Sequence, residues 1–369
     1  MSSPYSSDYR SHRTSDNPAL KKVALFTDVD FWAGGAGHRM RIAALISYLS
    51  ERLKLTVIYT GDIPRPDTSG WCFTFVNVPP GQTDHLDEFL LEVLPDNQFD
   101  AAIIEYIHNS YWLASLPEDV RRILDAHDIV SERAQSFAAF DYASALFEIP
   151  ADLEFELFDQ YDHVMALTKQ DARKIGAVIG EQKTLLCPHP ASTRRHVIRQ
   201  EVNTLGFIAS EYLPNYDALC FFLKDCWPSL RDNDDISLQV YGNVGKWFRD
   251  DPPRKRVAFR GFVPDLKGIY NEVDIVINPV RFGAGLKIKN IEAMANGLPL
   301  VTTTHGAAGL EAAIGKALLV ADSAGDFIAQ LHLLIRSYPL RAEMGRNGYL
   351  LASTSYSPEI CFGPLLKVI

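Results

Sequence analysis

The feature that most constrains the fold is an alternation of short apolar runs with helical stretches, which occurs twice along the chain. The apolar run at 23–27 ends in a cluster of aspartates and glycines, and a helical stretch follows at 39–53. The same order recurs from residue 204 onward. Continuous apolar strands that alternate with helices are typical of a parallel sheet covered on both faces. We therefore predict an α/β protein of two Rossmann-like, doubly wound domains that face each other across a cleft.

The pattern also gives the approximate bounds of the elements. In the first half, strands are predicted at 23–27, 55–61, 72–78, 101–107 and 163–168, and helices at 39–53 and 85–94. Thr168 and Asp171 have the spacing of a helix N-cap. In the second half, strands are predicted at 204–208, 237–241, 257–259, 275–278, 300–303 and 317–320, and helices at 217–227, 266–272, 286–296 and 323–337.

Two prolines interrupt this periodicity near 186–200 and indicate a boundary between domains. We predict a disordered lead-in at 1–20, an acceptor-side domain at 21–187 and a donor-binding domain at 188–350. A tail follows at 351–369, for which packing back on the first domain is one option.

Composition excludes several classes of protein. A net charge of −10 argues against extended nucleic-acid binding, which needs a basic surface. The five cysteines are scattered without metal-ligand spacing, which favours reduced thiols and neither disulfides nor zinc. No apolar run reaches the ~20 residues of a membrane helix, and the polar first residues do not resemble a signal peptide. We expect a cytoplasmic protein, with peripheral contact at the inner membrane face left open.

Two clusters after strands in the first half are candidate ligand contacts. Residues 34–39 (GGAGHR) place glycines and His38 at the start of a helix, where backbone amides favour an anion or a sugar hydroxyl; a plain tight turn is the alternative. His127 and Asp128 follow an apolar run, and the histidine could bind a ligand, move a proton or only fix a loop. Arg133 could add positive charge to the same face.

The most informative segment is 262–312. A predicted strand at 275–278 runs into a loop with Gly283 and Gly285, and the helix that follows carries Lys287, Lys289 and Glu292. Amides and lysines at the start of a helix form a trap for a diphosphate. Glu292, further along that helix, suits a bidentate grip on the vicinal hydroxyls of a ribose. The alternative is an amphipathic helix whose charges are solvated.

An Asp-x-Asp pair at Asp28 and Asp30 resembles the metal-binding motifs of some phosphatases and of metal-dependent transferases. The phosphatase pattern fails because Trp32 occupies the position where a threonine is needed. In the metal-dependent transferases the pair follows several strands and not the first. We therefore expect no metal ion and no cofactor.

From Gly285 to Leu310 the sequence resembles the retaining GT-B glycosyltransferases of the large "group 1" family (glycosyltransferase family 4). Their pattern G-x-[KR]-x-K-x-x-E-A-M-A-x-G-x-P-[LV]-V-x-T-x-x-G-x-x-G-L is met here almost throughout. Matches of the same kind occur at 206–219, 238–242 and 261–265, and the positions of residues 34–37 and 127–128 fit more loosely. The resemblance spans about residues 22–350 and is stronger in the second half.

This resemblance implies a site for a nucleotide-diphosphate sugar, which serves as co-substrate. Glu292 would hold the ribose, Lys287 and Lys289 the diphosphate, and backbone at Phe262 and Val263 the base. Further donor contacts are implied for Gly35, Gly37, Gly283, Ala284, Gly285 and Leu286. His127 would contact the sugar or the leaving group, and with Lys289 and Glu292 it makes up the implied catalytic set. Transfer would retain anomeric configuration without a metal.

The acceptor side is less defined. Candidates are His38, Tyr106, His108 and Arg133, and the aromatic group formed with Tyr111 and Trp112 could face a saccharide or serve only for packing. A glycan or a lipid-linked acceptor would suit the family, and the oligomeric state is left open.

Two departures from the family pattern concern the donor site. Many members carry a glutamate eight positions before Glu292, where this chain has Ala284. An Arg and a Lys that often follow the first strand of the donor domain are also missing, with Ala209 and Asn215 lying there. A nucleotide-sugar epimerase or hydrolase on the same fold, or a non-catalytic sugar-binding module, are therefore the alternative functions.

Overall fold

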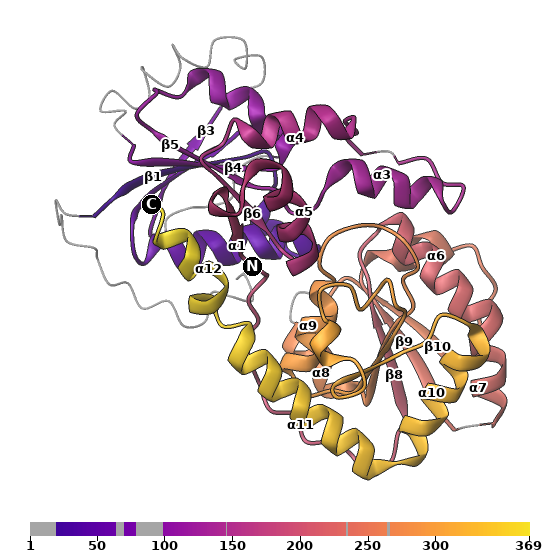
Figure 1. Ribbon diagram of the computed structural model, residues 1–369. Coiled ribbons are helices and arrows are strands. Elements are labelled where there is room, and N and C mark those ends of the chain that lie inside the picture. The colour runs from indigo at the N-terminus through magenta and orange to yellow at the C-terminus, as the bar shows by residue number, and fades with distance from the viewer. Residues whose placement is uncertain (1–19, 64–69, 79–98, 145, 234, 264–265) are drawn as a thin grey trace. The chain divides into compact units, whose positions relative to one another are not determined.

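The computed structural model describes residues 20–63, 70–78, 99–144, 146–233, 235–263 and 266–369 (Figure 1). The chain divides into two compact units. Unit 1 comprises 1–34, 38–188 and 358–369, and unit 2 comprises 35–37 and 189–357. The predicted helix at 85–94 and the lead-in up to residue 19 lie outside the described residues. Among the described residues, no helix combines the length and the apolar character needed to cross a membrane.

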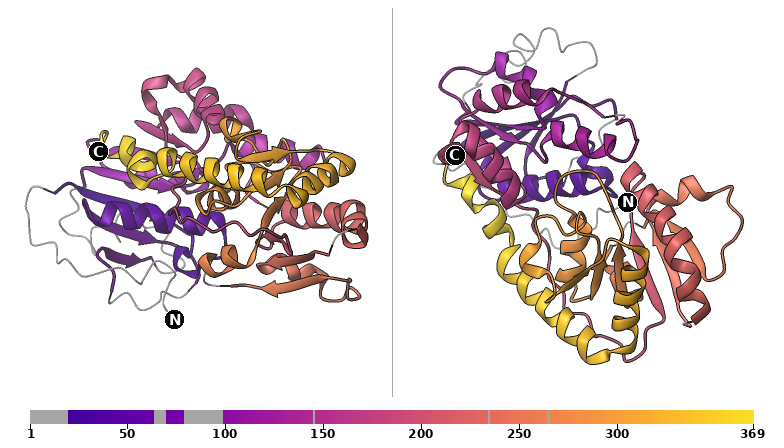
Figure 2. Two further views of the ribbon diagram at one scale, coloured as in Figure 1. Left: turned by 90° about the horizontal axis from the view of Figure 1, so that it is seen from below. Right: turned by 45° about the vertical axis from the view of Figure 1, so that its right-hand side comes forward.

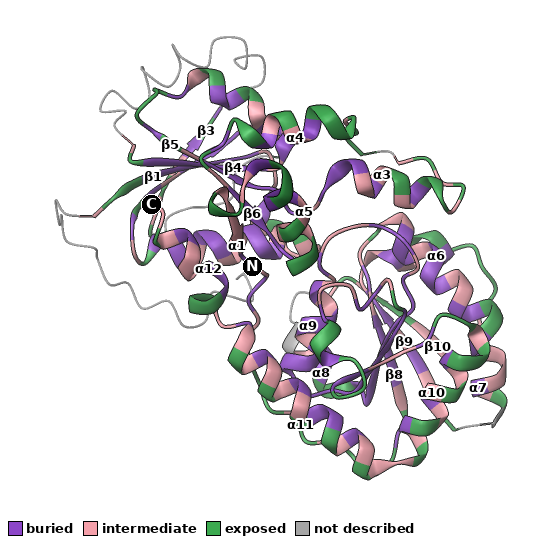
Figure 3. Ribbon diagram, in the orientation of Figure 1, coloured by how far each residue is buried: buried purple, intermediate pink, exposed green. Residues whose placement is uncertain are grey.

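Unit 1 is built on a seven-stranded parallel sheet of order β3-β2-β1-β4-β5-β6-β7. The central strands form because their residues are apolar without interruption and are buried from both sides, as Figure 3 shows. The strands are β1 (Lys22–Thr27), β2 (Lys54–Tyr59), β3 (Thr74–Asn77), β4 (Ala101–Glu105), β5 (Arg121–Asp125), β6 (His163–Ala166) and β7 (Thr184–Leu186). The strand order reverses between β1 and β4, where open α/β sheets usually bind ligands.

The helices of unit 1 lie between these strands in sequence, except α12, which comes from the end of the chain. They are η1 (Phe31–Ala33), α1 (Gly37–Ser50), η3 (Ile107–Ser115), α3 (Val130–Ala138), α4 (Ala151–Asp159), α5 (Lys169–Ile179), η4 (Glu181–Lys183) and α12 (Pro358–Leu366). The predicted cap of α5 is confirmed, since the amide of Asp171 donates to the hydroxyl oxygen of Thr168 over 3.0 Å. Helix α12, from the end of the chain, packs in this unit through Phe362, whose ring centroid lies 5.6 Å from that of Tyr48.

Unit 2 contains a six-stranded parallel sheet of order β10-β9-β8-β11-β12-β13, with helices on both of its faces (Figure 2). Its strands are β8 (Thr204–Ile208), β9 (Ser237–Tyr241), β10 (Val257–Gly261), β11 (Ile275–Asn278), β12 (Leu300–Thr302) and β13 (Leu318–Val320). Its helices are α6 (Leu213–Phe221), η5 (Phe222–Cys226), α7 (Trp227–Asn233), η6 (Asn243–Phe248), α8 (Leu266–Glu272), α9 (Ile288–Ala295), η7 (Glu311–Ala313), α10 (Ala324–Arg336) and α11 (Tyr338–Ser355). The two-domain α/β class predicted from the sequence is confirmed.

Three element predictions need correction. The strand predicted at 101–107 ends at Glu105, because Tyr106 has a left-handed φ of 65° that no strand accommodates. The helix predicted at 217–227 begins earlier, at Leu213, and runs on through a π-helical segment, η5, into α7. Helices α3, α4, α11 and α12 were not predicted.

Candidate functional site

The predicted donor helix is present as α9, and the loop before it needs glycine. Gly283 and Gly285 have φ values of 114° and 67°, a region that residues with a side chain rarely occupy. A Cβ atom on Gly283 would also lie 3.4 Å from Cγ of Pro214. A side chain would strain the backbone at both positions, so the path of the loop between β11 and α9 favours glycine there.

Lys289 and Glu292 lie one turn apart on α9, and each is partly buried. Lys289 Nζ donates to Asn215 Oδ1 over 2.7 Å and lies 4.9 Å from the ring centroid of Phe207. Burial, together with the nearby Lys287, lowers the pKa of Lys289 to about 7. Burial raises the pKa of Glu292 to about 7, although Tyr270 donates a hydrogen bond to it over 3.0 Å. Both groups can thus change charge near neutral pH when a ligand binds.

Lys287 has a different position from Lys289. Its Nζ donates to the carbonyl oxygens of Ala284 over 3.2 Å and of Gly285 over 2.9 Å. Leu286, which lies between Gly285 and Lys287 in sequence, is buried. The ammonium group of Lys287 therefore binds the backbone of the glycine loop that precedes it.

An ion pair that sequence reasoning missed holds the start of the same loop. Arg281 binds Asp217 of α6 with two hydrogen bonds of 2.9 and 2.6 Å, and its guanidinium lies 5.0 Å from the ring centroid of Phe221. Since Asp217 is buried and lies 64 residues away in sequence, no local pattern predicts this pair. It fixes the position of the loop relative to α6.

A buried chain of amide and hydroxyl groups lies beneath α9. Asn278 Nδ2 donates to Asn290 Oδ1 over 2.9 Å, and Asn290 Nδ2 donates to the carbonyl of Gly306 over 2.8 Å. Thr302 Oγ1 donates to the carbonyl of Asn278 over 2.8 Å. Asn278, Asn290 and Thr302 are fully buried, so these bonds tie β11, β12 and α9 together beneath the candidate donor site.

The remaining donor candidates occupy loops. Phe262 and Val263 follow β10 directly, and Phe262 is 45% exposed. Gly35 has a left-handed φ of 74°, and Gly37 is the first residue of α1. Their contacts with a nucleotide sugar stay predictions.

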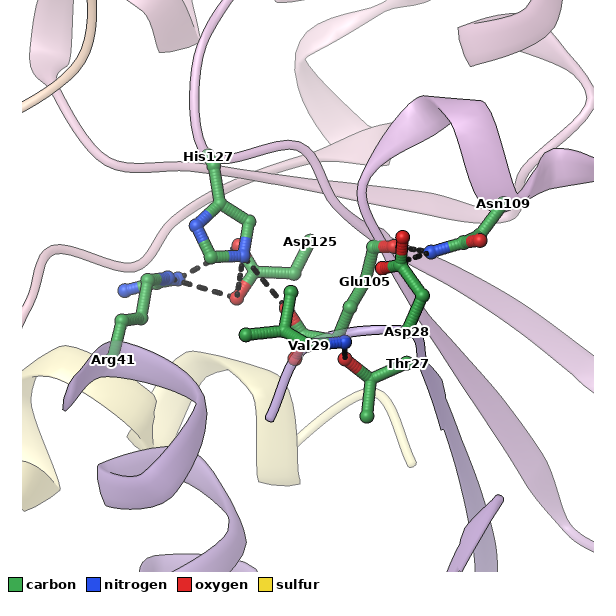
Figure 4. A network of polar contacts seen from close by, with 8 residues as sticks. All are labelled: Thr27, Asp28, Val29, Arg41, Glu105, Asn109, Asp125 and His127. Carbon is green, nitrogen blue, oxygen red and sulfur yellow. Dashed lines mark hydrogen bonds and ion pairs between the residues drawn. The ribbon is translucent and has the colours of Figure 1, made fainter. Parts of the chain in front are cut away.

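In unit 1 the carboxyl ends of β4 and β5 carry a buried network of charged side chains (Figure 4). Glu105 and Asp125 are paired neighbours in the two strands. Asp125 accepts two hydrogen bonds, of 2.8 and 2.9 Å, from Arg41 of α1. Glu105 Oε2 lies 2.7 Å from Nε2 of His127. We refer to Arg41, Glu105, Asp125 and His127 as the buried quartet.

Only His127 of this quartet was predicted. A signal for Glu105 did exist, because it is the one charged residue in the apolar run at 101–107, and a charged residue is almost never fully buried unless it is paired. Burial lowers the pKa of His127 to about 4 and, with Asp125, raises that of Glu105 well above its usual value.

The structure brings most of the acceptor-side candidates together around Tyr106. Its ring is stacked on that of His127 at 3.9 Å and on that of His108 at 5.4 Å, and His38 lies 6.5 Å away. Burial lowers the pKa of His38 to about 4, so its ring is neutral at physiological pH. Arg133 is bound to Asp128 by two hydrogen bonds of 2.9 Å, which neutralises the charge expected of it.

His108 and its neighbours also engage the Asp-x-Asp pair. Asp28 contacts Nε2 of His108 at 3.0 Å and accepts from Asn109 over 3.1 Å. Burial raises the pKa of Asp28, but the bonds from His108 and Asn109 outweigh it and the net shift is downward. Asp30 is paired with Arg39. Of the other two aromatic candidates, Trp112 is fully buried and serves for packing, while Tyr111 is 44% exposed.

Glu105, Asp125 and His127 also place one potential ligand atom each within 4.8 Å of one another, a spacing that a metal ion could use. Arg41, however, already binds both carboxylate oxygens of Asp125. A second positive charge at this place would be repelled by the guanidinium, so the geometry favours a proton-sharing network over a metal centre.

Comparisons with known proteins agree with this architecture. Residues 202–337 match the family model described as "Glycosyl transferases group 1". A protein described as "Uncharacterized 44.6 kDa protein in cps region", from Klebsiella pneumoniae, is 22% identical over 223 residues, which cover 58% of this chain and 57% of the relative. The chain thus aligns with little more than half the length of that relative.

Solved structures share the fold over nearly the whole chain. The Anabaena protein Alr3699/HepE, in complex with UDP and glucose, superposes with a TM-score of 0.70 at 12% identity and covers 95% of this chain and 99% of its own. WaaG, a glycosyltransferase involved in lipopolysaccharide biosynthesis, gives a TM-score of 0.64 at 16% identity, covering 94% and 98%. At such identities the likeness establishes the fold, which is that of the GT-B glycosyltransferases.

Proposed function

We propose that this chain, whose residues 202–337 match the family model of group 1 glycosyl transferases, transfers a sugar from a nucleotide-diphosphate sugar to a saccharide, lipid-linked or other hydroxyl acceptor. We further propose that transfer retains anomeric configuration, needs no metal ion and takes place in the cytoplasm. The observation that carries the proposal is the position of Lys289 and Glu292 one turn apart on α9, which follows a loop with positive φ at Gly283 and Gly285.

Lys289 suits an anionic ligand because of the partner that it has now. It donates to the neutral amide oxygen of Asn215, whereas Arg281 and Arg133 are each neutralised by a carboxylate. A diphosphate would restore the full charge of Lys289 and bind it with charge-assisted hydrogen bonds. The same charge stabilises the nucleoside diphosphate as it departs from the sugar.

Glu292 suits the ribose for a complementary reason. Two vicinal hydroxyls can donate to the two oxygens of one carboxylate, and Tyr270 already orients Glu292 Oε2 through its 3.0 Å hydrogen bond. Since both groups have a pKa of about 7, Lys289 and Glu292 are each only partly ionised at pH 7. Donor binding moves both toward their charged forms, one taking up a proton and the other releasing one.

The glycine loop takes over the task of the missing glutamate. Where many relatives have a carboxylate, this chain has Ala284, and the loop offers backbone amides to the donor sugar. Lys287 holds the carbonyls of Ala284 and Gly285, and Arg281 holds the start of the loop against Asp217. The loop is therefore ordered before the donor arrives, which reduces the entropy lost on binding.

The test uses the whole chain and a panel of nucleotide sugars. We expect slow release of nucleoside diphosphate with one donor, faster on addition of the acceptor. Glu292→Ala should weaken binding of that donor by about 10–150-fold, since hydrogen bonds to a charged group contribute about 1.5–3 kcal/mol. Glu343→Ala is the matched control, because Glu343 is an exposed glutamate on another helix of unit 2.

Other outcomes would point elsewhere. A free sugar with an inverted centre would indicate an epimerase or hydrolase, and binding without release of nucleoside diphosphate would indicate a binding module. If Glu292→Ala and Glu343→Ala retain equal donor affinity, the donor site does not lie on α9.

A further inference from the structure

The buried quartet contains a carboxyl group that the proposed donor site does not use. Glu105 is completely buried at the end of β4, and one of its oxygens lies 2.7 Å from Nε2 of His127. Its other oxygen, Oε1, is buried without a hydrogen-bond partner among the described residues. The one hydrogen-bond partner of this buried acidic side chain, His127, is neutral at pH 7, so no positive charge compensates Glu105 in this contact.

The backbone on both sides of this contact is strained. Tyr106 directly follows Glu105, and His127 lies two positions after Asp125. Both have left-handed φ values, 65° for Tyr106 and 60° for His127, although neither is glycine. These two conformations bring the rings of Tyr106 and His127 face to face at 3.9 Å with an interplanar angle of 12°. Strain of this kind persists where the surrounding structure needs the geometry, and it is concentrated at functional sites. The imidazole of His127 is thus held by stacking on Tyr106 and by the contact of its Nε2 with Glu105.

The charges around Glu105 decide which atom carries the proton of this contact. Arg41 gives its hydrogen bonds to Asp125, and the other acidic group facing Glu105 is Asp28. Burial and the charge of Asp125 therefore favour the protonated form of Glu105. The acidic groups that face His127 are Asp125 and Asp128, and the basic groups are Arg41 and His108. Burial lowers the pKa of His127 to about 4, so its ring is neutral at pH 7.

A neutral carboxyl and a neutral imidazole can form this hydrogen bond in two ways, because the acid has one O–H to donate and a carbonyl oxygen that can accept. If Nε2–H donated to Oε2 of Glu105, the acid O–H would lie on Oε1, which is buried without a hydrogen-bond partner among the described residues, and that donor would be unsatisfied. The structure therefore favours the O–H on Oε2, where it donates to an unprotonated Nε2. The ring proton of His127 is then on Nδ1.

We propose that Glu105 is a positioning residue, whose carboxylic acid donates to Nε2 of His127 and thereby fixes the imidazole as the Nδ1–H tautomer. Nδ1–H is then the donor that His127 offers to an oxygen of the nucleotide sugar. The second statement rests on the proposed function, and the first does not.

The first test is spectroscopic and does not need activity. The full chain is labelled with ¹⁵N-histidine, and the His127 signals in long-range ¹H–¹⁵N spectra are assigned by their loss in His127→Gln. We expect the Nδ1–H pattern at pH 7 in the wild type. The pattern should persist in Glu105→Gln, whose amide can donate at the same place, and give way to a mixture of tautomers in Glu105→Leu.

The dependence on pH separates this role from simple packing. As the pH rises until Glu105 ionises, the wild type should change to the Nε2–H tautomer, whereas Glu105→Gln should not change. The matched control is Glu154→Leu, because Glu154 is equally buried in unit 1 but accepts from the amides of Val130 and Ser131. It should disturb folding similarly and leave the tautomer of His127 unchanged.

The second test measures turnover of the nucleotide sugar. Glu105→Leu should lower kcat about tenfold or more and leave the KM for the nucleotide sugar nearly unchanged, while Glu105→Gln should retain most of the rate. An Nε2–H tautomer in the wild type at pH 7 would overturn the proposal. So would a shift of the His127 signal on addition of Mg²⁺, Mn²⁺ or Zn²⁺ that Glu105→Leu abolishes, since the quartet would then be a metal site. If no variant shows turnover while the tautomers behave as expected, the proposed function fails and the positioning role of Glu105 stands.

Discussion

The ion pair between Arg41 and Asp125 should be the most sensitive point of unit 1 to a single substitution. Both side chains are completely excluded from solvent, and two hydrogen bonds of 2.8 and 2.9 Å join them. Asp125→Ala would leave the guanidinium of Arg41 buried without its counter-charge. Removing one partner of a buried pair destabilises a protein by about 3–5 kcal/mol. For a domain of this size, that corresponds to a fall in Tm of about 6–20 °C.

The chain supplies a matched control in the same unit. Arg39 binds Asp30 through two hydrogen bonds of 2.7 and 2.9 Å, so the geometry is alike, but the side chain of Arg39 is 32% exposed. Because water can solvate a partly exposed guanidinium, Asp30→Ala should lower the stability by only about 1 kcal/mol or less. The double variant Arg41→Met with Asp125→Leu removes both charges together, so it should recover most of the stability that Asp125→Ala loses.

The assay is urea unfolding of the full chain, combined with hydrogen exchange of peptides from β5 and α1. The exchange measurement is needed because the two units can unfold separately, and a single transition midpoint would then not describe unit 1. Equal losses in Asp125→Ala and Asp30→Ala would refute the reasoning. So would a double variant as unstable as Asp125→Ala, since that would mean that packing and not the buried charge sets the loss.

Three further predictions concern unit 2. Burial raises the pKa of Glu292 from 4.5 to about 7, so the stability that its protonated form contributes is complete below pH 4.5 and is lost as the pH rises through 7. The stability of Glu292→Gln relative to the wild type should therefore increase between pH 5 and pH 8, by at most about 3 kcal/mol. A difference in Tm that stays constant over that range would contradict this. Asn290→Ala would leave a buried amide and a buried carbonyl without partners and should lower the free energy of unfolding in urea by about 2–4 kcal/mol, a loss below about 1 kcal/mol being incompatible with the buried chain. A Cβ atom on Gly345 would lie 2.1 Å from the carbonyl oxygen of Gly297, so Gly345→Ala should lower Tm. The control is Gly325→Ala on α10, where no atom lies within 4 Å of the added Cβ, and this variant should leave Tm unchanged or raise it. Equal effects of the two substitutions would show that helices α9 and α11 are not in close contact.

Much of the fold could be predicted from the sequence because its signals are local. The strands β1, β8 and β11 are uninterrupted apolar runs, and Thr168 caps α5 at the expected place. The donor helix was predicted for the same reason, since its glycines, lysines and glutamate lie within one short segment of the chain.

The partners of those residues could not be predicted, because they come from distant segments. Asn215, which accepts from Lys289, is 74 positions away from it, and Arg41 is 84 positions from Asp125. Helix α11 was missed for a different reason. It packs against α9 through Gly345 and Gly348, so its buried residues are mostly small or charged, with Met344 as the one large apolar side chain among them, and the helical pattern of apolar residues is weak.

The two departures from the family pattern are better understood together than separately. Asn215 lies where relatives often have a basic residue, and Ala284 lies where many have a glutamate. If only the glutamate had been lost, the cations at the start of α9 would face an excess of positive charge. Because the Arg and the Lys are missing as well, at Ala209 and Asn215, the site lacks two positive charges and one negative charge of the family pattern, and Asn215 accepts a hydrogen bond from Lys289. Lys289 then carries more of the interaction with the diphosphate, so Lys289→Ala should weaken nucleoside diphosphate binding much more than Asn215→Ala does. Titration calorimetry with UDP and GDP on both variants measures this directly, and equal losses would mean that Lys289 acts only through its bond to Asn215.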